Sequence, residues 1–196
     1  YRRLNATVFT FFRPENFLGL HELRPHVMHY TVWNFASGRH ESQFTHIDNH
    51  WEWLSGHEVH TGVNLVKEGL FQPFEIFPGV IVPTGIYDHA EARLTAHTDR
   101  GAPISAAIGS TIGGFFGGDR VQLGPSVSVR AGETFNAQLR WDWNDINLPG
   151  GDFITNLASF RVSYSFSTRL FFQALLQYNE KRSMVLFTRD DGPDAQ

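Results

Sequence analysis

The stretch FNAQLRWDW, residues 135–143, decides the fold class of this 196-residue chain. Its odd positions carry Phe135, Ala137, Leu139, Trp141 and Trp143, and its even positions carry Asn136, Gln138, Arg140 and Asp142. Successive side chains of a β-strand point to opposite faces of its sheet, so this period of two predicts a strand with one apolar and one polar face.

The same alternation recurs along the whole chain. Besides residues 135–143, it marks residues 5–12, 26–35, 44–53, 57–66, 89–97, 104–112, 121–130, 160–166 and 170–178. We therefore expect an all-β protein, an antiparallel up-and-down meander of about nine or ten long strands. Nothing in the composition marks a second kind of region, so residues 1–196 are expected to form one domain, with residues 181–196 irregular.

Strand length and connections favour a transmembrane β-barrel. Most candidate strands run roughly 9 to 12 residues, close to what a tilted strand needs to cross a bilayer. Tight links are expected near residues 55–56, 99–102, 131–133 and 167–168, and long loops at residues 68–86, 113–119 and 145–152, an alternation typical of bacterial barrels. Aromatic residues at strand ends fit an interfacial belt: Trp51, Trp53, Trp141, Trp143 and Tyr178.

The bulk composition excludes several classes of protein. The formal net charge is −4, without long runs of either sign, so nucleic acid is not an expected partner. The chain has no cysteine, which excludes thiol catalysis, disulfides and Cys-ligated zinc. It begins at Tyr1 without a secretory leader, so we expect a processed chain or a fragment.

Several blocks of sequence carry a family resemblance. They are FRPENFLGLHELRPH, HIDNHWEW, HEVHTGVN, QPFEIFPGVIVPTGIYDH, IGGFFGGDRV, FNAQLRWDWNDINLPGGDFITNL and SYSFSTRLFFQALLQYNE. Together they resemble the C-terminal β-barrel region of a bacterial family of unknown function, whose longer members carry a carbohydrate-binding module of family 9. The resemblance implies the outer membrane of a Gram-negative bacterium as location and the lipid bilayer as partner.

Two departures from that family limit what the resemblance implies. The carbohydrate-binding module is not in this chain, so a carbohydrate partner is expected only through a module elsewhere. The chain ends in KRSMVLFTRDDGPDAQ, residues 181–196, without the aromatic residue that closes the last strand of a bacterial barrel. We therefore expect an incomplete barrel, to which the parent protein adds strands.

The polar faces of the predicted strands carry the candidate site residues. Candidates for a ligand site or a polar lumen wall are His46, Asp48, His50, Glu52, His60, His89, Glu91, Arg93, Arg140 and Arg161. In a lumen, Arg93, Arg130, Arg140 and Arg161 are expected to pair with Asp48, Glu52, Glu91 and Asp142.

Two chemical alternatives remain open for these residues. His46, His50 and His60 are weak candidates for metal ligands beside a plain solvated wall, and no cofactor is predicted. Glycoside hydrolysis uses a pair of carboxylates, for which Asp48 and Glu52 are nominal candidates. Nothing in the sequence fixes their separation, so no catalytic residue is assigned. We expect an outer-membrane barrel segment for transport, secretion or surface display; the alternative is a soluble or envelope-associated β-protein linked to carbohydrate binding or glycan hydrolysis.

Overall fold

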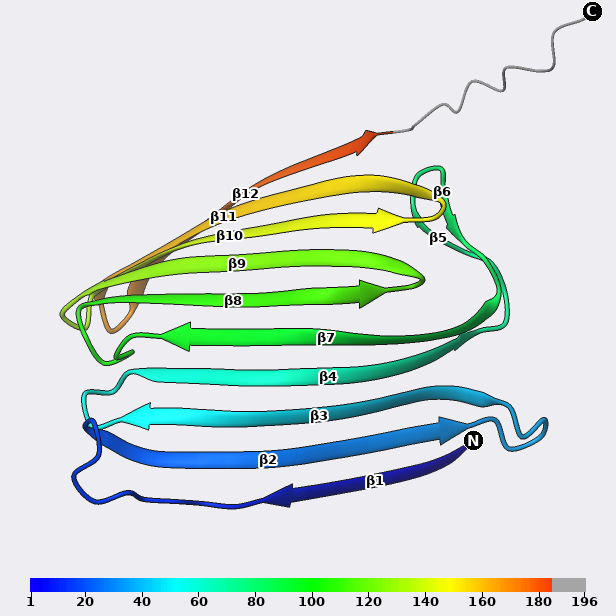
Figure 1. Ribbon diagram of the computed structural model, residues 1–196. Helices are drawn as coiled ribbons and strands as arrows, with labels where there is room; N and C mark the ends of the chain where they lie inside the picture. Colours follow the sequence, from blue (N-terminus) through cyan, green and yellow to red (C-terminus); the bar gives the residue numbers. More distant parts are fainter. Residues whose placement is uncertain (185–196) are drawn as a thin grey trace, which may run out of the picture.

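The computed structural model describes residues 1–184, and they form one long antiparallel sheet with a small hairpin at one end (Figure 1). Ten strands follow each other through the sheet in chain order: β1 (Arg2–Phe9), β2 (Leu20–Trp33), β3 (His40–Trp53), β4 (Glu58–Leu70), β7 (Gly85–His97), β8 (Ile104–Phe115), β9 (Gly118–Ala131), β10 (Phe135–Leu148), β11 (Gly151–Ser167) and β12 (Leu170–Met184). The predicted all-β meander is confirmed.

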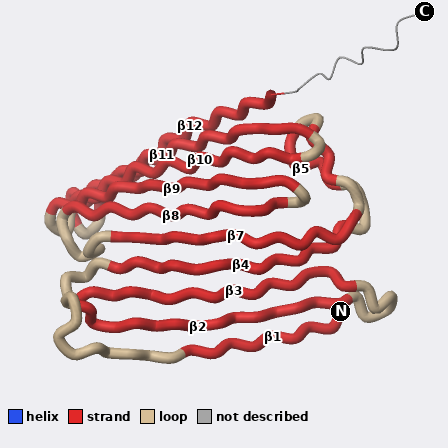
Figure 2. Tube along the Cα trace, viewed as in Figure 1, coloured by secondary structure: helices blue, strands red, loops and turns tan. Residues whose placement is uncertain are grey.

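The sheet is open within the described residues. β1 pairs only with β2 and β12 only with β11, so these two strands form opposite edges and the sheet is not closed into a barrel (Figure 1). Figure 2 shows strands and loops only, and no helix of residues 1–184 is long and apolar enough to cross a membrane.

Two of the three predicted long loops are wrong. Residues 113–119 and 145–152 are mostly strand, because β8 and β9 are joined by a two-residue turn at Phe116-Gly117, and β10 and β11 by one at Pro149-Gly150. Phe116 and Gly117 both have positive φ, 46° and 84°, as the tight hairpin turn of type I′ requires. The glycines of this region therefore allow a sharp reversal and not a long loop.

The end of the chain also differs from the prediction. Residues 181–184 belong to β12, where Lys181 pairs with Thr155 of β11, so the irregular region does not begin at residue 181. This extension follows from the unexpected length of β11, which runs from Gly151 and offers backbone groups to pair with. The rest of the predicted irregular tail, residues 185–196, lies outside the described residues.

The third predicted loop is ordered around a second, two-stranded sheet. β5 (Phe74–Phe77) and β6 (Val80–Val82) turn at Pro78-Gly79, where Gly79 has φ 82°. Phe77, Val80 and Val82 are buried against Ile146, Leu148 and Phe153 at the adjoining ends of β10 and β11. This cluster is the main apolar core of the described residues, and it lies at one end of the sheet (Figure 1), called the hairpin end below.

The register shows two chemically opposite faces on the ten-stranded sheet. The polar face carries Glu22, Asp48, Asn64, Glu91 and His97, all buried. The other, apolar face leaves large side chains exposed, among them Leu139 at 55% and Ile112 at 51%. Soluble proteins bury apolar and expose charged side chains, so this burial pattern is inverted.

The apolar face of β4 and β7–β12 has a wide uncharged belt. Along β10 it runs from Phe135 to Trp143, nine residues, and the charged residues on this face all lie beyond it toward the hairpin end. They are Lys67, Asp88, Asp119, Asp145, Asp152, Glu180 and Arg182. Over β2 and β3 the same face is mixed, because His29 and Thr45 interrupt Val27 and Ile47.

Aromatic side chains border this belt on both sides. Register places Trp141, Ala158 and Tyr178 in one row on β10, β11 and β12, next to the charged residues. A second row, Phe135, Tyr164 and Phe172, lies at the opposite end of the same strands. Along β10 and β12 the face therefore changes from aromatic to apolar to aromatic to charged.

Candidate functional site

The structure places all ten predicted site residues on the polar face. They come from β3 (His46, Asp48, His50, Glu52), β4 (His60), β7 (His89, Glu91, Arg93), β10 (Arg140) and β11 (Arg161). Residues directly opposite one another in an antiparallel pair lie on the same face, so alternation within each strand fixes the side. The site is therefore a wall that crosses most of the sheet, densest over β2, β3, β4 and β7.

Glu58 is the hub of the first cluster on this wall. His60 Nε2 donates a hydrogen bond to its Oε1 at 2.7 Å, and His97 Nε2 donates to its Oε2 at 2.9 Å. Arg24 Nη2 donates to the same Oε1 at 3.0 Å and to Glu52 Oε2 at 3.2 Å. Both oxygens of Glu58 are thus occupied by donors, and a permanent cation lies beside them.

The Arg24 side chain extends this cluster toward one end of the sheet. Its Nε lies 3.3 Å from Glu22 Oε1, and Arg13 of the β1–β2 connection donates to Glu22 Oε2 at 2.8 Å. Glu22 and Glu52 therefore share one guanidinium, an ion-pair network that uses the several donors of arginine.

Asp48 is the centre of a second cluster, next to the first. It pairs in register with His26 of β2 and with Gly62 of β4, and its neighbours two residues away on the same face are His46 and His50. His46 Nε2 lies 3.3 Å and His50 Nε2 3.6 Å from Asp48 Oδ2. The rings of His50 and His60 stack, with centroids 3.6 Å apart, and this contact joins the two clusters.

Glu91 is the centre of a third group, farther across the sheet. It pairs with Arg120 of β9, and Asn64 Nδ2 donates to its Oε2 at 3.4 Å. The Arg120 guanidinium also lies 4.4 Å from the centroid of the Phe115 ring. A buried carboxylate thus has both a paired cation and a neutral donor, as buried charges require.

The predicted ion pairs are only partly correct. Arg140 pairs with Asp142 of its own strand, at 2.7 and 2.6 Å. Glu52 and Glu91, however, pair with Arg24 and Arg120, which lie just outside the strand ranges expected from the sequence. These strands extend further than the alternation indicates, so the actual cation partners come from the added residues.

Three predicted residues stay apart from these groups. Among residues 1–184, Arg93 and Arg161 form no ion pair, and His89 contacts the rings of Phe115 and Phe116 instead of the other histidines. Sequence reasoning also missed members of the clusters: Arg24, His26, Glu58, His97 and Arg120. Their signal is the hairpin register, which for example pairs His26 of β2 with Asp48 of β3.

A recess of about 530 Å³ lies on the polar face between these groups. Side chains of six strands line it, including Asn64, Glu91, Arg93, Arg120 and Arg140. The polar side chains of these strands therefore border one shared hollow.

No known protein family, characterised protein or solved structure matches the chain. The proposed function therefore rests on the fold and the site, and the family resemblance of the sequence blocks stays a prediction.

Proposed function

We propose that this sheet is a segment of an outer-membrane β-barrel, with its apolar face in contact with lipid and its polar face lining the lumen. The observation that supports it most is the uncharged belt of β4 and β7–β12, with charges on its hairpin side and with aromatic rows at both borders on β10–β12. Nine residues of β10 cross it, against about 9 to 11 for a tilted strand spanning the hydrocarbon core. Aromatic girdles at both boundaries are typical of such barrels.

The two edges of the sheet bear on the same proposal. Unpaired backbone N–H and C=O groups are costly in hydrocarbon, so a sheet in a bilayer has to close. β1 and β12 each have one free side within the described residues, and we infer that further strands pair with both. The segment would then support transport, secretion or surface display as part of a larger barrel.

The lumen in this proposal is narrowed at the hairpin end. The β5–β6 hairpin packs on Ile146 and Phe153, which pair with each other on the polar face. An inward-folded connection of this kind reduces the width of a barrel pore.

The alternative function is a soluble or envelope-associated β-protein that acts on or binds glycans. In that case a second layer of structure has to cover Leu139, Phe160 and their neighbours, because a contiguous apolar patch of this kind is rarely exposed to water. The two functions therefore differ in what contacts the apolar face.

Folding into lipid tests the proposal. The protein is refolded with lipid vesicles and run on a detergent gel with and without boiling, and the vesicles are washed at alkaline pH and floated. We expect heat-modifiable migration and flotation with lipid. A monodisperse monomer in detergent-free buffer, with no flotation, contradicts the membrane proposal and favours the soluble alternative.

A further inference from the structure

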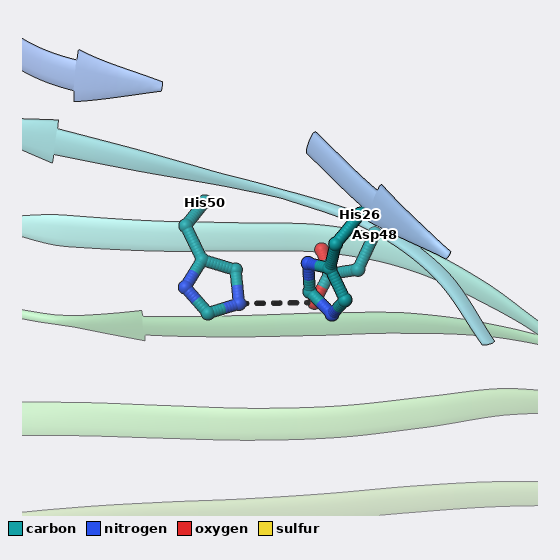
Figure 3. Close-up of side chains that lie close together, drawn as sticks. All are labelled: His26, Asp48 and His50. Atoms are coloured by element: carbon teal, nitrogen blue, oxygen red, sulfur yellow. Dashed lines mark ion pairs between the residues drawn. The ribbon is translucent and has the colours of Figure 1, made fainter. Parts of the chain in front are cut away.

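Asp48 is surrounded by three histidines on the polar face of β2 and β3. His26 lies opposite it across the strand pair, and His46 and His50 flank it along β3. Figure 3 shows the carboxylate of Asp48 beside the rings of His26 and His50, and ligand atoms of these three residues all lie within 4.8 Å of one another. The His26 and His46 ring centroids are 5.2 Å apart, so the third imidazole adjoins the same carboxylate.

The contacts of Asp48 with its flanking histidines are longer than the hydrogen bonds of Glu58 with His60 and His97, and His50 also has its Nδ1 3.4 Å from Glu58 Oε1. Asp48 Oδ2 lies 3.3 Å from His46 Nε2 and 3.6 Å from His50 Nε2, against 2.7 Å and 2.9 Å for the hydrogen bonds that Glu58 accepts from His60 and His97. In a tetrahedral zinc site with bonds of about 2.0–2.1 Å, neighbouring ligand atoms are about 3.4 Å apart. The two distances from Asp48 Oδ2 to His46 and His50 are close to this spacing.

The hydrogen bonds of His46 leave a lone pair directed at Asp48. His46 Nδ1 lies 2.7 Å from Asn64 Oδ1, and the amide nitrogen of Asn64 donates to Glu91, so the Asn64 oxygen is the acceptor. His46 Nδ1 therefore carries the hydrogen, and in the neutral ring Nε2 is the free acceptor facing the carboxylate. Two acceptors face each other there, an arrangement that a cation between them stabilises.

His26 has the same kind of outer partner. Its Nδ1 lies 3.3 Å from the backbone carbonyl oxygen of Arg24, which only accepts hydrogen bonds. The other ring nitrogen is then free to act as a ligand. Metal-bound histidines almost always donate their second ring N–H to a carbonyl, carboxylate or amide in this way.

The charge of Asp48 is also uncompensated. Its side chain is only 5% exposed, and its Oδ1 has no hydrogen-bond partner. No lysine or arginine of residues 1–184 pairs with it, whereas Glu58 has Arg24 at 3.0 Å. A buried carboxylate requires a cation, and of the two only Asp48 has no arginine or lysine paired with it within the described residues.

We propose that His26, His46, Asp48 and His50 bind one divalent transition metal of the zinc class. Three imidazole nitrogens and one carboxylate oxygen suit Zn²⁺, while Mg²⁺ and Ca²⁺ take oxygen ligands. The metal joins β2 to β3 on the polar face. This inference does not rest on lipid contact, because the site is complete within two neighbouring strands.

A zinc titration of the full chain tests this inference. The protein, without a polyhistidine tag, is folded in detergent micelles and titrated against a chromophoric zinc chelator, with Co²⁺ absorption as a second readout of tetrahedral geometry. We expect one tightly bound Zn²⁺ per chain. Removal of the central ligand in Asp48→Asn is expected to weaken binding at least about 100-fold, more than the usual loss of an outer-shell partner.

Further variants locate the site. His26→Gln is expected to weaken binding as Asp48→Asn does, and it serves as the ligand variant if Asp48→Asn does not fold. Asn64→Ala removes only the hydrogen-bond partner of His46, and we expect it to lower the affinity for zinc about 10-fold. The matched control is His29→Gln, on the apolar face of β2, which is expected to bind zinc as the unaltered protein does. His60→Gln, in the Glu58 cluster and stacked on His50, is expected to lose less zinc affinity than Asp48→Asn.

Circular dichroism and gel migration establish that each variant is folded. Unchanged affinity in Asp48→Asn or in His26→Gln overturns the proposal, as does the absence of stoichiometric binding by the unaltered protein. If His60→Gln loses as much zinc affinity as Asp48→Asn or more, the metal is bound at Glu58, and this result also overturns the assignment. The zinc titration is made in micelles and does not require insertion into vesicles. A protein that fails to enter lipid vesicles contradicts the membrane proposal but not the zinc site, so the two proposals can fail separately.

Discussion

The ring of Phe77 stacks on the ring of Phe153, with centroids 4.5 Å apart and planes inclined by 16°. The two residues are far apart in the sequence, and their contact fixes the β5–β6 hairpin onto the polar face near the ends of β10 and β11. Both rings are buried, Phe77 at 9% and Phe153 at 4% exposure. The long connection between β4 and β7 is therefore part of the folded wall and not a free loop.

Replacement of Phe77 by alanine tests how firmly this hairpin is held. Because a buried ring is removed and a cavity is left, we expect Phe77→Ala to lower the free energy of unfolding by about 3 kcal/mol. Protease cleavage within residues 71–84 should become faster. Phe74→Ala is the matched control, since Phe74 lies in the same hairpin but is 49% exposed. Equal sensitivity of the two variants would show that the packing against Phe153 does not hold the hairpin.

The Glu91–Arg120 pair provides a second prediction. Glu91→Gln leaves the Arg120 charge without its partner in a partly buried place, so we expect a loss of about 3 kcal/mol in denaturant unfolding. The control is Asp142→Asn, in the half-exposed pair with Arg140, which is expected to lower the free energy of unfolding by less than about 1 kcal/mol. If Glu91→Gln is as mild as the control, the buried pair does not stabilise the sheet.

Gly118 tests the tight turn that replaces the expected loop. A Cβ atom there would overlap the carbonyl oxygen of Asn147, so Gly118→Ala forces β9 and β10 apart. We expect destabilisation of about 2 kcal/mol or more. Gly109→Ala, where a Cβ meets nothing within 4 Å, should be neutral or stabilising by a few tenths to about 1 kcal/mol. The midpoints of urea unfolding separate the two results.

The strands and their two faces could be predicted from the sequence because alternation is a local signal. In β10 the shared face of the five apolar residues from Phe135 to Trp143 follows from their spacing alone, so it can be predicted without knowing which strands lie beside β10. Strand ends could not be predicted in this way. Glycines at 113, 114, 117 and 118 indicate a loop by composition, but close approach to Asn147 is what requires Gly118.

The site residues of β3 could be predicted for the same reason, and their partners could not. His46, Asp48 and His50 share a face within one strand, whereas His26 and Glu58 join them through the register of two hairpins. Register depends on turn geometry and on where each strand begins. The expected partners of Glu52 and Glu91 were wrong because Arg24 and Arg120 lie in strand extensions without clear alternation.

A charge placed in the belt tests the environment of the apolar face. Leu139 is the central residue of the belt on β10, which runs from Phe135 to Trp143, and an arginine at the midplane of a bilayer costs about 2–4 kcal/mol. We expect Leu139→Arg to lower the free energy of unfolding from lipid vesicles by this amount. Gln138→Arg, one residue away on the polar face, is expected to change stability by less than about 1 kcal/mol. A reversed order would place the lipid on the other face.

The central claim is that the apolar face of this sheet lies in lipid and the polar face in water. The chain has no cysteine, so single cysteines can be introduced at each position from 135 to 143 and spin-labelled without background. Electron paramagnetic resonance of the protein in vesicles then measures the collision of each label with oxygen, which concentrates in lipid, and with a nickel chelate, which stays in water.

The account predicts opposite alternation in these two collision rates. Labels at odd positions, such as 137 and 139, should collide mainly with oxygen, and labels at even positions, such as 136 and 138, mainly with the nickel chelate. Odd positions that are shielded from both reagents, or that collide with the nickel chelate in water, would contradict the claim that this face contacts lipid.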